Sequence, residues 1–142
     1  MKALMLFVLL LMLSPQLQAA EVLNNETEVK QLTENVMQKV SENLWKEALL
    51  LLRPYSLNPV AEFDSEVGQV ELQIPVINQR FGSAINYDFV KREAVGDSLL
   101  RYVYLQKFEK HVMSWHFIFY KPKDVWQLNA WSFDDNVESF FQ

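Results

Sequence analysis

Cysteine is absent from this chain of 142 residues, and histidine occurs only twice. The lack of cysteine excludes a disulfide framework and removes the thiolate ligands of structural zinc sites. Two histidines without cysteine are a poor ligand set for a transition metal. Stability must come from an apolar core, for which the chain supplies 10 phenylalanines, 5 tyrosines and 4 tryptophans. We therefore expect neither a metal nor a cofactor.

Basic residues are also in short supply. Lysine and arginine together number 13, against 18 acidic residues, and the net charge is −5. Proteins that bind nucleic acid or anionic lipid head groups present a basic surface to the phosphates. This composition argues against both kinds of partner.

The first 20 residues differ from the rest of the chain. Lys2 precedes an unbroken apolar run over residues 3–13, and the small residues Ala19 and Ala20 follow. This is the layout of a secretory signal peptide, and the run is too short for a membrane-spanning helix, which needs roughly 20 apolar residues. We predict a signal peptide over residues 1–20, cleaved after Ala19 or Ala20, and a single periplasmic domain over residues 21–142. The alternative is an uncleaved N-terminal anchor.

Apolar residues spaced three or four apart predict a first helix over about residues 26–52. Asn25 and Glu28 have the spacing of a capping box at its start. The helix is expected to end at Arg53, because the residue before a proline disfavours the helical conformation.

A second helix is predicted over about residues 65–80, after a loop at 56–63. Asp64 is a candidate cap for this helix, and Pro75 is expected to kink it. Gly82 lies where a residue with positive φ would end the helix.

From residue 84 the apolar pattern changes to a period of two, which is typical of strands. Short breaks separate the strands, so neighbouring strands are expected to be antiparallel. We predict an α+β domain, with two N-terminal helices packed on a curved four-stranded antiparallel meander. The four strands are expected at 86–94, 98–108, 112–120 and 125–133.

Four segments carry a resemblance to a known superfamily. They are the stretch from Trp45 through Tyr55, RFG at 80–82, YLQKF at 104–108, and WHFIFYKPKDVWQLNAWSF at 115–133. Together with the element order, they resemble the nuclear-transport-factor-two-like, or cystatin-like, α+β superfamily, and in particular its small exported bacterial domains of unknown function. The resemblance implies a cone-shaped α+β fold. That superfamily contains isomerases, cyclases and members without activity, so no catalytic residue is carried over. The outer sheet face of such domains often forms a homodimer.

Pairing of the last two strands determines which residues share a face. If Tyr120 pairs with Val125, then Trp115 lies opposite Ala130 and Phe117 lies opposite Leu128. The face with Trp115 and Phe117 is apolar and is expected to pack against the helices. The opposite, outer face would then bring His116, Asn129 and Trp131 together.

His116 is the one candidate for acid–base chemistry on that outer face, since histidine titrates near neutral pH. Asn129 could orient it, but no acidic partner is expected nearby, and catalysis needs such a partner. We therefore name no catalytic residue. His116, Asn129 and Trp131 are instead candidate binding residues, and the outer face is the candidate interaction surface.

Tyr102 and Tyr104 leave an alternative open. They would join the binding surface if they share the face of His116, or extend the core if they do not, with Arg101, Val103 and Leu105 facing out.

The acidic run at 134–136 lacks the alternating ligands and distant glutamate of a calcium loop, and is better explained as a strand end.

These observations favour a non-enzymatic binding module, with a second copy of the chain or another periplasmic protein as partner. The alternative is an isomerase- or cyclase-like enzyme, or a binder of a small apolar ligand. It would need a pocket between sheet and helices, lined by Trp45, Tyr55 and Tyr104.

Overall fold

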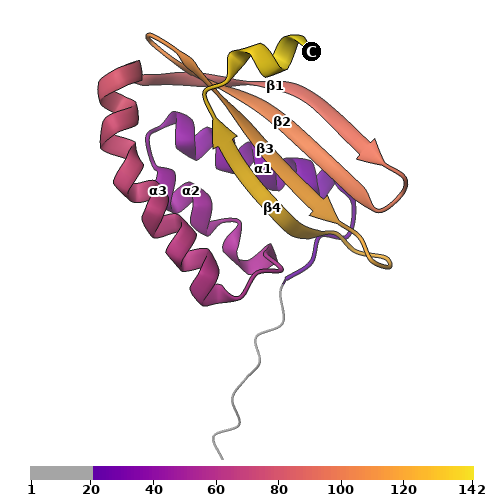
Figure 1. Cartoon of the computed structure of the whole chain (residues 1–142). Helices are drawn as coiled ribbons and strands as arrows, with labels where there is room; N and C mark the ends of the chain where they lie inside the picture. The colour runs from indigo at the N-terminus through magenta and orange to yellow at the C-terminus, as the bar shows by residue number, and fades with distance from the viewer. Residues whose placement is uncertain (1–20) are drawn as a thin grey trace, which may run out of the picture.

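The computed structural model describes residues 21–142, so the predicted signal peptide lies outside the described residues. Helices come first and a sheet follows, in the order α1, α2, α3, β1, β2, β3, β4 (Figure 1). Two short 3-10 helices complete the fold, η1 after α2 and η2 at the C terminus. The bounds are α1 Glu26–Ser41, α2 Trp45–Leu50, η1 Arg53–Tyr55, α3 Val60–Phe81, β1 Ala84–Val95, β2 Leu99–Phe108, β3 Val112–Tyr120, β4 Gln127–Asp134 and η2 Val137–Phe141.

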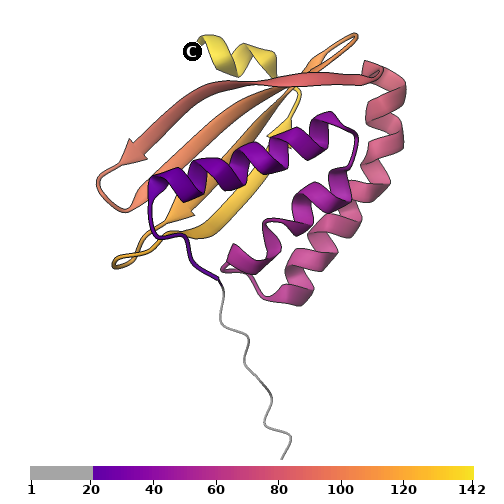
Figure 2. The same cartoon turned by 180° about the vertical axis from the view of Figure 1, so that it is seen from behind.

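The four strands form one antiparallel sheet in the order β1-β2-β3-β4. All three α-helices of the described chain lie on the same side of this sheet, as the two opposite views show (Figures 1 and 2). The α+β class and the antiparallel meander are confirmed. The sheet therefore has an inner face, which the α-helices cover, and an outer face, which no α-helix of residues 21–142 covers.

Helix α1 begins as the sequence predicts. The Asn25 side chain accepts a hydrogen bond from the Glu28 backbone N–H at 3.0 Å. The Glu28 carboxylate in turn accepts one from the Asn24 backbone N–H at 2.7 Å. Both bonds satisfy donors at a helix start, where no intrahelical acceptor exists.

The prediction of one long first helix is wrong, because the chain turns at Asn43. This residue has a φ of 62°, outside the range of a right-handed helix. The Asn43 side chain accepts a hydrogen bond from the Trp45 indole at 3.2 Å, which helps to stabilise the turn. The break redirects the apolar segment that follows, so that Ala48, Leu49 and Leu52 are fully buried.

Helix α3 begins about one turn earlier than predicted. Pro59 occupies the N-cap position, and the expected loop at 56–63 is therefore partly helical. Asp64 is not a cap: its carboxylate receives two hydrogen bonds of 2.8 Å from the Arg53 guanidinium, which links α3 to η1. Pro75 lies within the helix, and Gly82 follows it with a φ of 81°.

Gln106 connects the sheet to α1 in the middle of the core. Its side chain is fully buried and donates a hydrogen bond to the Val40 carbonyl at 3.0 Å. Its carbonyl oxygen accepts a hydrogen bond from the Trp115 indole at 2.9 Å. Trp115 packs against Trp45, with ring centroids 5.3 Å apart, and against Phe133, at 5.0 Å. One amide side chain thus joins a helix end to the largest aromatic cluster of the core.

The predicted pairing of β3 with β4 is wrong, and the error changes which residues share a face. Tyr120 pairs with Gln127, two residues beyond Val125, and this shift alone would preserve the faces. Ile118 then pairs with Ala130 while Phe119 pairs with Leu128, so Asn129 is an extra residue in β4. Such a bulge reverses the facing of every later residue of the strand.

We predict that Gln106→Leu destabilises the fold by about 1–3 kcal/mol, because it leaves the Trp115 N–H buried without a partner. The Val40 carbonyl loses one of its bonds but still accepts from the Asn43 backbone N–H at 3.1 Å. Urea denaturation of the variant measures the loss of stability. The matched control is Gln73→Leu, at an exposed position of α3, for which we expect a change within about 0.5 kcal/mol. Equal midpoints for the two variants would contradict the role given to Gln106.

Candidate functional site

The three residues predicted to form one binding surface do not share a face. Trp131 pairs with Phe117 and lies on the inner face, 6.1 Å from the Phe63 ring between centroids. His116 pairs with Ser132 on the outer face. Asn129 is the exposed bulge residue of the edge strand β4. The prediction that Asn129 lies opposite His116 is wrong, since the bulge separates them in register.

Tyr102 and Tyr104 lie on the inner face, opposite Phe117 and Trp115. Both are buried, and the Tyr104 hydroxyl is 2.7 Å from the Thr33 hydroxyl of α1. Burial raises the pKa of both phenols. The two tyrosines therefore extend the core, which was the second of the two alternatives, and the Tyr104 hydroxyl has its partner within it.

His116 lies near the middle of the outer face, half-buried beside Val103 of β2. Its Nε2 atom is 3.3 Å from the Ser114 hydroxyl. Burial lowers the pKa of His116, and the positive charges of Arg101 and Lys91 lower it further, whereas Asp134 and Glu93 act in the opposite direction. The imidazole is therefore neutral at pH 7 and has no carboxylate hydrogen-bond partner among the described residues, an arrangement that suits packing better than acid–base chemistry.

The outer face is arranged in cross-strand rows. The row nearest the β1–β2 turn is apolar, and in it Val95, Leu99 and Tyr120 are neighbours with exposed fractions of 70%, 36% and 38%. The next row contains the ion pair of Arg101 with Glu93, whose atoms are 2.5 Å apart. The row after that runs through Lys91, Val103, His116 and Ser132. The end of this face nearest the β1–β2 turn is thus apolar, whereas β1 and β2 carry charged side chains farther from that turn.

The space between the sheet and the helices is filled with side chains. Trp45, Tyr104, Phe117, Phe119 and Leu52 are buried there, and none is more than 1% exposed. Tyr55 is only partly buried at the margin of this core. The residues expected to line an internal pocket are therefore packing residues of the core.

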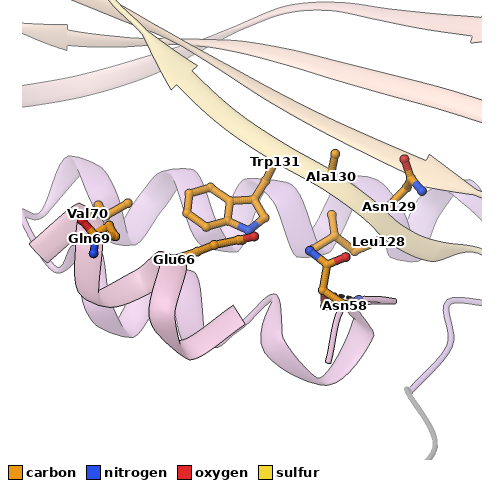
Figure 3. A pocket seen from close by; sticks show the side chains of 9 residues that line it. Asn58, Glu66, Gln69, Val70, Leu128, Asn129, Ala130 and Trp131 are labelled. Carbon is orange, nitrogen blue, oxygen red and sulfur yellow. Dashed lines mark hydrogen bonds between the residues drawn. The ribbon is translucent and has the colours of Figure 1, made fainter. Parts of the chain in front are cut away.

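Three hollows of the described surface are open grooves. One groove, of about 310 Å³, lies between the edge strand β4 and helix α3 (Figure 3). Trp131 reaches from β4 toward α3, and the Glu66 side chain passes beneath its ring (Figure 3). Two further grooves, of about 390 and 300 Å³, lie by Asn43 and Gly82 and along the start of α1.

The groove residues on α3, chiefly Glu66 and Gln69, were not predicted as site residues. The sequence pattern predicts a helix start at residue 65 and gives no indication that these side chains approach β4. The dipeptide Asn58-Pro59 indicates the earlier start of α3, because proline favours the first positions of a helix.

Within residues 21–142, no group of three or more histidine, aspartate or glutamate side chains is placed to hold a metal ion. The Asp134 carboxylate instead accepts a hydrogen bond from the Asn136 backbone N–H at 2.8 Å, as expected of a turn at a strand end.

No helix within residues 21–142 combines the length and apolarity needed to cross a membrane.

No family model matches the chain, and no curated protein or solved structure is similar enough to it to be counted as a relative. The geometry of the site must therefore support any functional conclusion by itself.

The lowered pKa of His116 predicts a pH dependence of stability. The unfolded chain binds a proton at this histidine more readily than the folded chain does. The free energy of unfolding is therefore highest above the pKa of the unfolded chain, about 6.5, and it falls as the pH drops toward the lower pKa of the folded chain. Urea denaturation from pH 8 to pH 5 should show that His116→Gln loses less stability than the unsubstituted chain.

Comparison at pH 8, where the imidazole is neutral in both states, isolates the packing cost of this substitution. A steeper loss of stability in the variant than in the unsubstituted chain as the pH falls would contradict the assignment.

Proposed function

We propose that this chain is a non-enzymatic binding module that acts in the periplasm and recognises a protein partner through its outer sheet face. Export is supported by the apolar leader-like segment at residues 1–20. The absence of a catalytic role is supported by His116, which has a hydroxyl rather than a carboxylate beside it. The filled space between sheet and helices supports a surface interaction over an internal pocket.

The observation that carries the proposal is the exposed apolar row on the outer face. Val95, Leu99 and Tyr120 are exposed neighbours on three adjacent strands. Isolated apolar residues are common on protein surfaces, but contiguous exposed ones mark interaction sites. A partner that covers this row would remove apolar area from water and gain roughly 25 cal/mol per Å².

We propose a second copy of the chain as that partner. The chain is acidic as a whole, and two copies repel each other unless they meet at a surface of balanced charge. The outer face provides this balance, because Lys107 is paired with Asp88 and Arg101 with Glu93 across its strands. A twofold contact uses the same patch on both copies, which a face carrying both signs can satisfy.

We also propose that the fold is cystatin-like. The order of helices before a four-stranded antiparallel meander supports this, and so does the position of the helices on one face of the sheet. Dimerisation through the outer face is the arrangement that this fold type would suggest.

Sedimentation equilibrium of the full-length chain, purified in the form that the expressing cell makes, tests the proposed dimer. We expect concentration-dependent dimerisation, and we expect Leu99→Glu to weaken it at least about tenfold, because a charge would be buried without a partner. The matched control is Leu72→Glu, which places the same charge on α3, where Leu72 is 74% exposed. If the chain remains monomeric up to a concentration of about 1 mM, the Kd of any dimer is weaker than 1 mM and the proposed dimer is overturned.

A further inference from the structure

The groove between β4 and α3 has a second feature, an open sheet edge. β4 is an edge strand, and from Asn129 to Asp134 it has no backbone partner other than β3 among residues 21–142. Unpaired backbone N–H and C=O groups along an edge are a template for another extended chain. This edge faces the groove of about 310 Å³ whose other wall is α3 (Figure 3).

The first part of the same edge already binds extended segments of this protein. Trp126 exchanges two backbone hydrogen bonds with Leu23, at 2.8 and 2.9 Å. Leu57 donates a backbone hydrogen bond of 3.0 Å to the Leu128 carbonyl, beside a parallel bridge from Ser56. After Asn58 the chain turns away into α3, and the edge beyond Leu128 is left without a partner in the described chain. The geometry for strand addition is thus already in use next to the open segment.

The two edges of the sheet differ in how they resist such pairing. β1, the opposite edge, has two register shifts and carries Lys91, Arg92 and Glu93 in succession. Charged side chains and bulges are the usual protection of an exposed edge. β4 has its bulge at Asn129, and the following residues Ala130 to Phe133 contain neither a charge nor a proline.

The wall of the groove that α3 forms is acidic. From Val60 to Gln79, helix α3 carries four acidic residues and no basic one. Asp64 is paired with Arg53 and Glu71 with Lys46, whereas Glu66, which lines the groove, forms no salt bridge in the described chain. A cationic side chain that enters the groove would meet Glu66 beside the Trp131 ring, which also attracts a cation.

The indole of Trp131 has an unpaired hydrogen-bond donor in the groove wall. This N–H is buried and has no hydrogen-bond partner. Buried polar groups are seldom left unpaired, and an orphan donor in a groove wall is a reason to look for an acceptor. A backbone carbonyl of a chain laid along β4 would be such an acceptor after a small rotation of the ring.

We propose that the β4–α3 groove binds an extended peptide segment of another protein, which adds as a fifth strand to β4 and places a lysine or arginine side chain against Glu66. Backbone hydrogen bonds would give the affinity, as in other cases of strand addition. Glu66 and Trp131 would give the preference for a basic residue. About six residues of peptide would span the open edge, since each strand residue advances the chain by about 3.3 Å.

A capped nine-residue peptide of alternating threonine and valine, with one central lysine, is the probe. Amide NMR spectra of the labelled full-length chain should shift at residues 129–134 on addition of this peptide, and hydrogen exchange of these amides should slow. A second peptide with glutamate in place of the lysine should bind roughly fivefold more weakly, the effect of one partly exposed ion pair.

Two variants separate charge recognition from general electrostatics. Glu66→Gln should weaken binding of the lysine peptide roughly fivefold and abolish the difference between the two peptides. Glu47→Gln removes the same charge from an exposed site on α2 and should leave binding unchanged.

The proposal is overturned if the β4 amides do not respond to about 1 mM lysine peptide, a concentration that half-fills a site with a Kd of 1 mM. It is also overturned if Glu66→Gln behaves as Glu47→Gln does. A response of the β4 amides to protein concentration instead of peptide would identify a second copy of the chain as the occupant, against the proposal. None of these outcomes depends on the outer face.

Discussion

The buried amide of Gln106 holds the first helix against the middle of the sheet. It donates to the Val40 carbonyl near the end of α1 and accepts from the Trp115 indole of β3, so it links the first helix to β2 and β3. A buried amide costs free energy when its donor or its acceptor is unpaired, and here the N–H and the carbonyl oxygen each have a partner. The aromatic packing of Trp45, Trp115 and Phe133 then fills the interior, and binding is left to the surface.

Much of the fold could be predicted from local pattern. The period-two alternation from residue 84 placed all four strands within about two residues, because alternation reports directly on which side chains are buried. The capping pair of Asn25 and Glu28 placed the start of α1 for a similarly local reason. The break at Asn43 could not be predicted, because the residues before and after it are apolar at helical spacing and only tertiary packing redirects the chain.

The candidate site was predicted less well, and one residue explains why. Asn129 adds a single residue to β4, and this brings Trp131 to the inner face while His116 stays on the outer face. The pattern contained a signal: Trp126, Leu128, Trp131 and Phe133 are spaced by two, three and two, which a regular strand cannot place on one face. The acidic wall of the groove is formed by α3, far from β4 in the sequence, so no local pattern could bring the two together.

The bulge therefore separates the two proposed binding surfaces, which are the outer face around Val95, Leu99 and Tyr120, and the groove beside Trp131. This division is tested by nuclear Overhauser effects that residues of β4 make with β3 and with α3 in the labelled protein. We expect a cross-strand contact of His116 with Ser132, and a contact of the Trp131 indole with the Phe63 ring of α3. Contacts of His116 with Asn129, or of Trp131 with Ser114, would contradict this division.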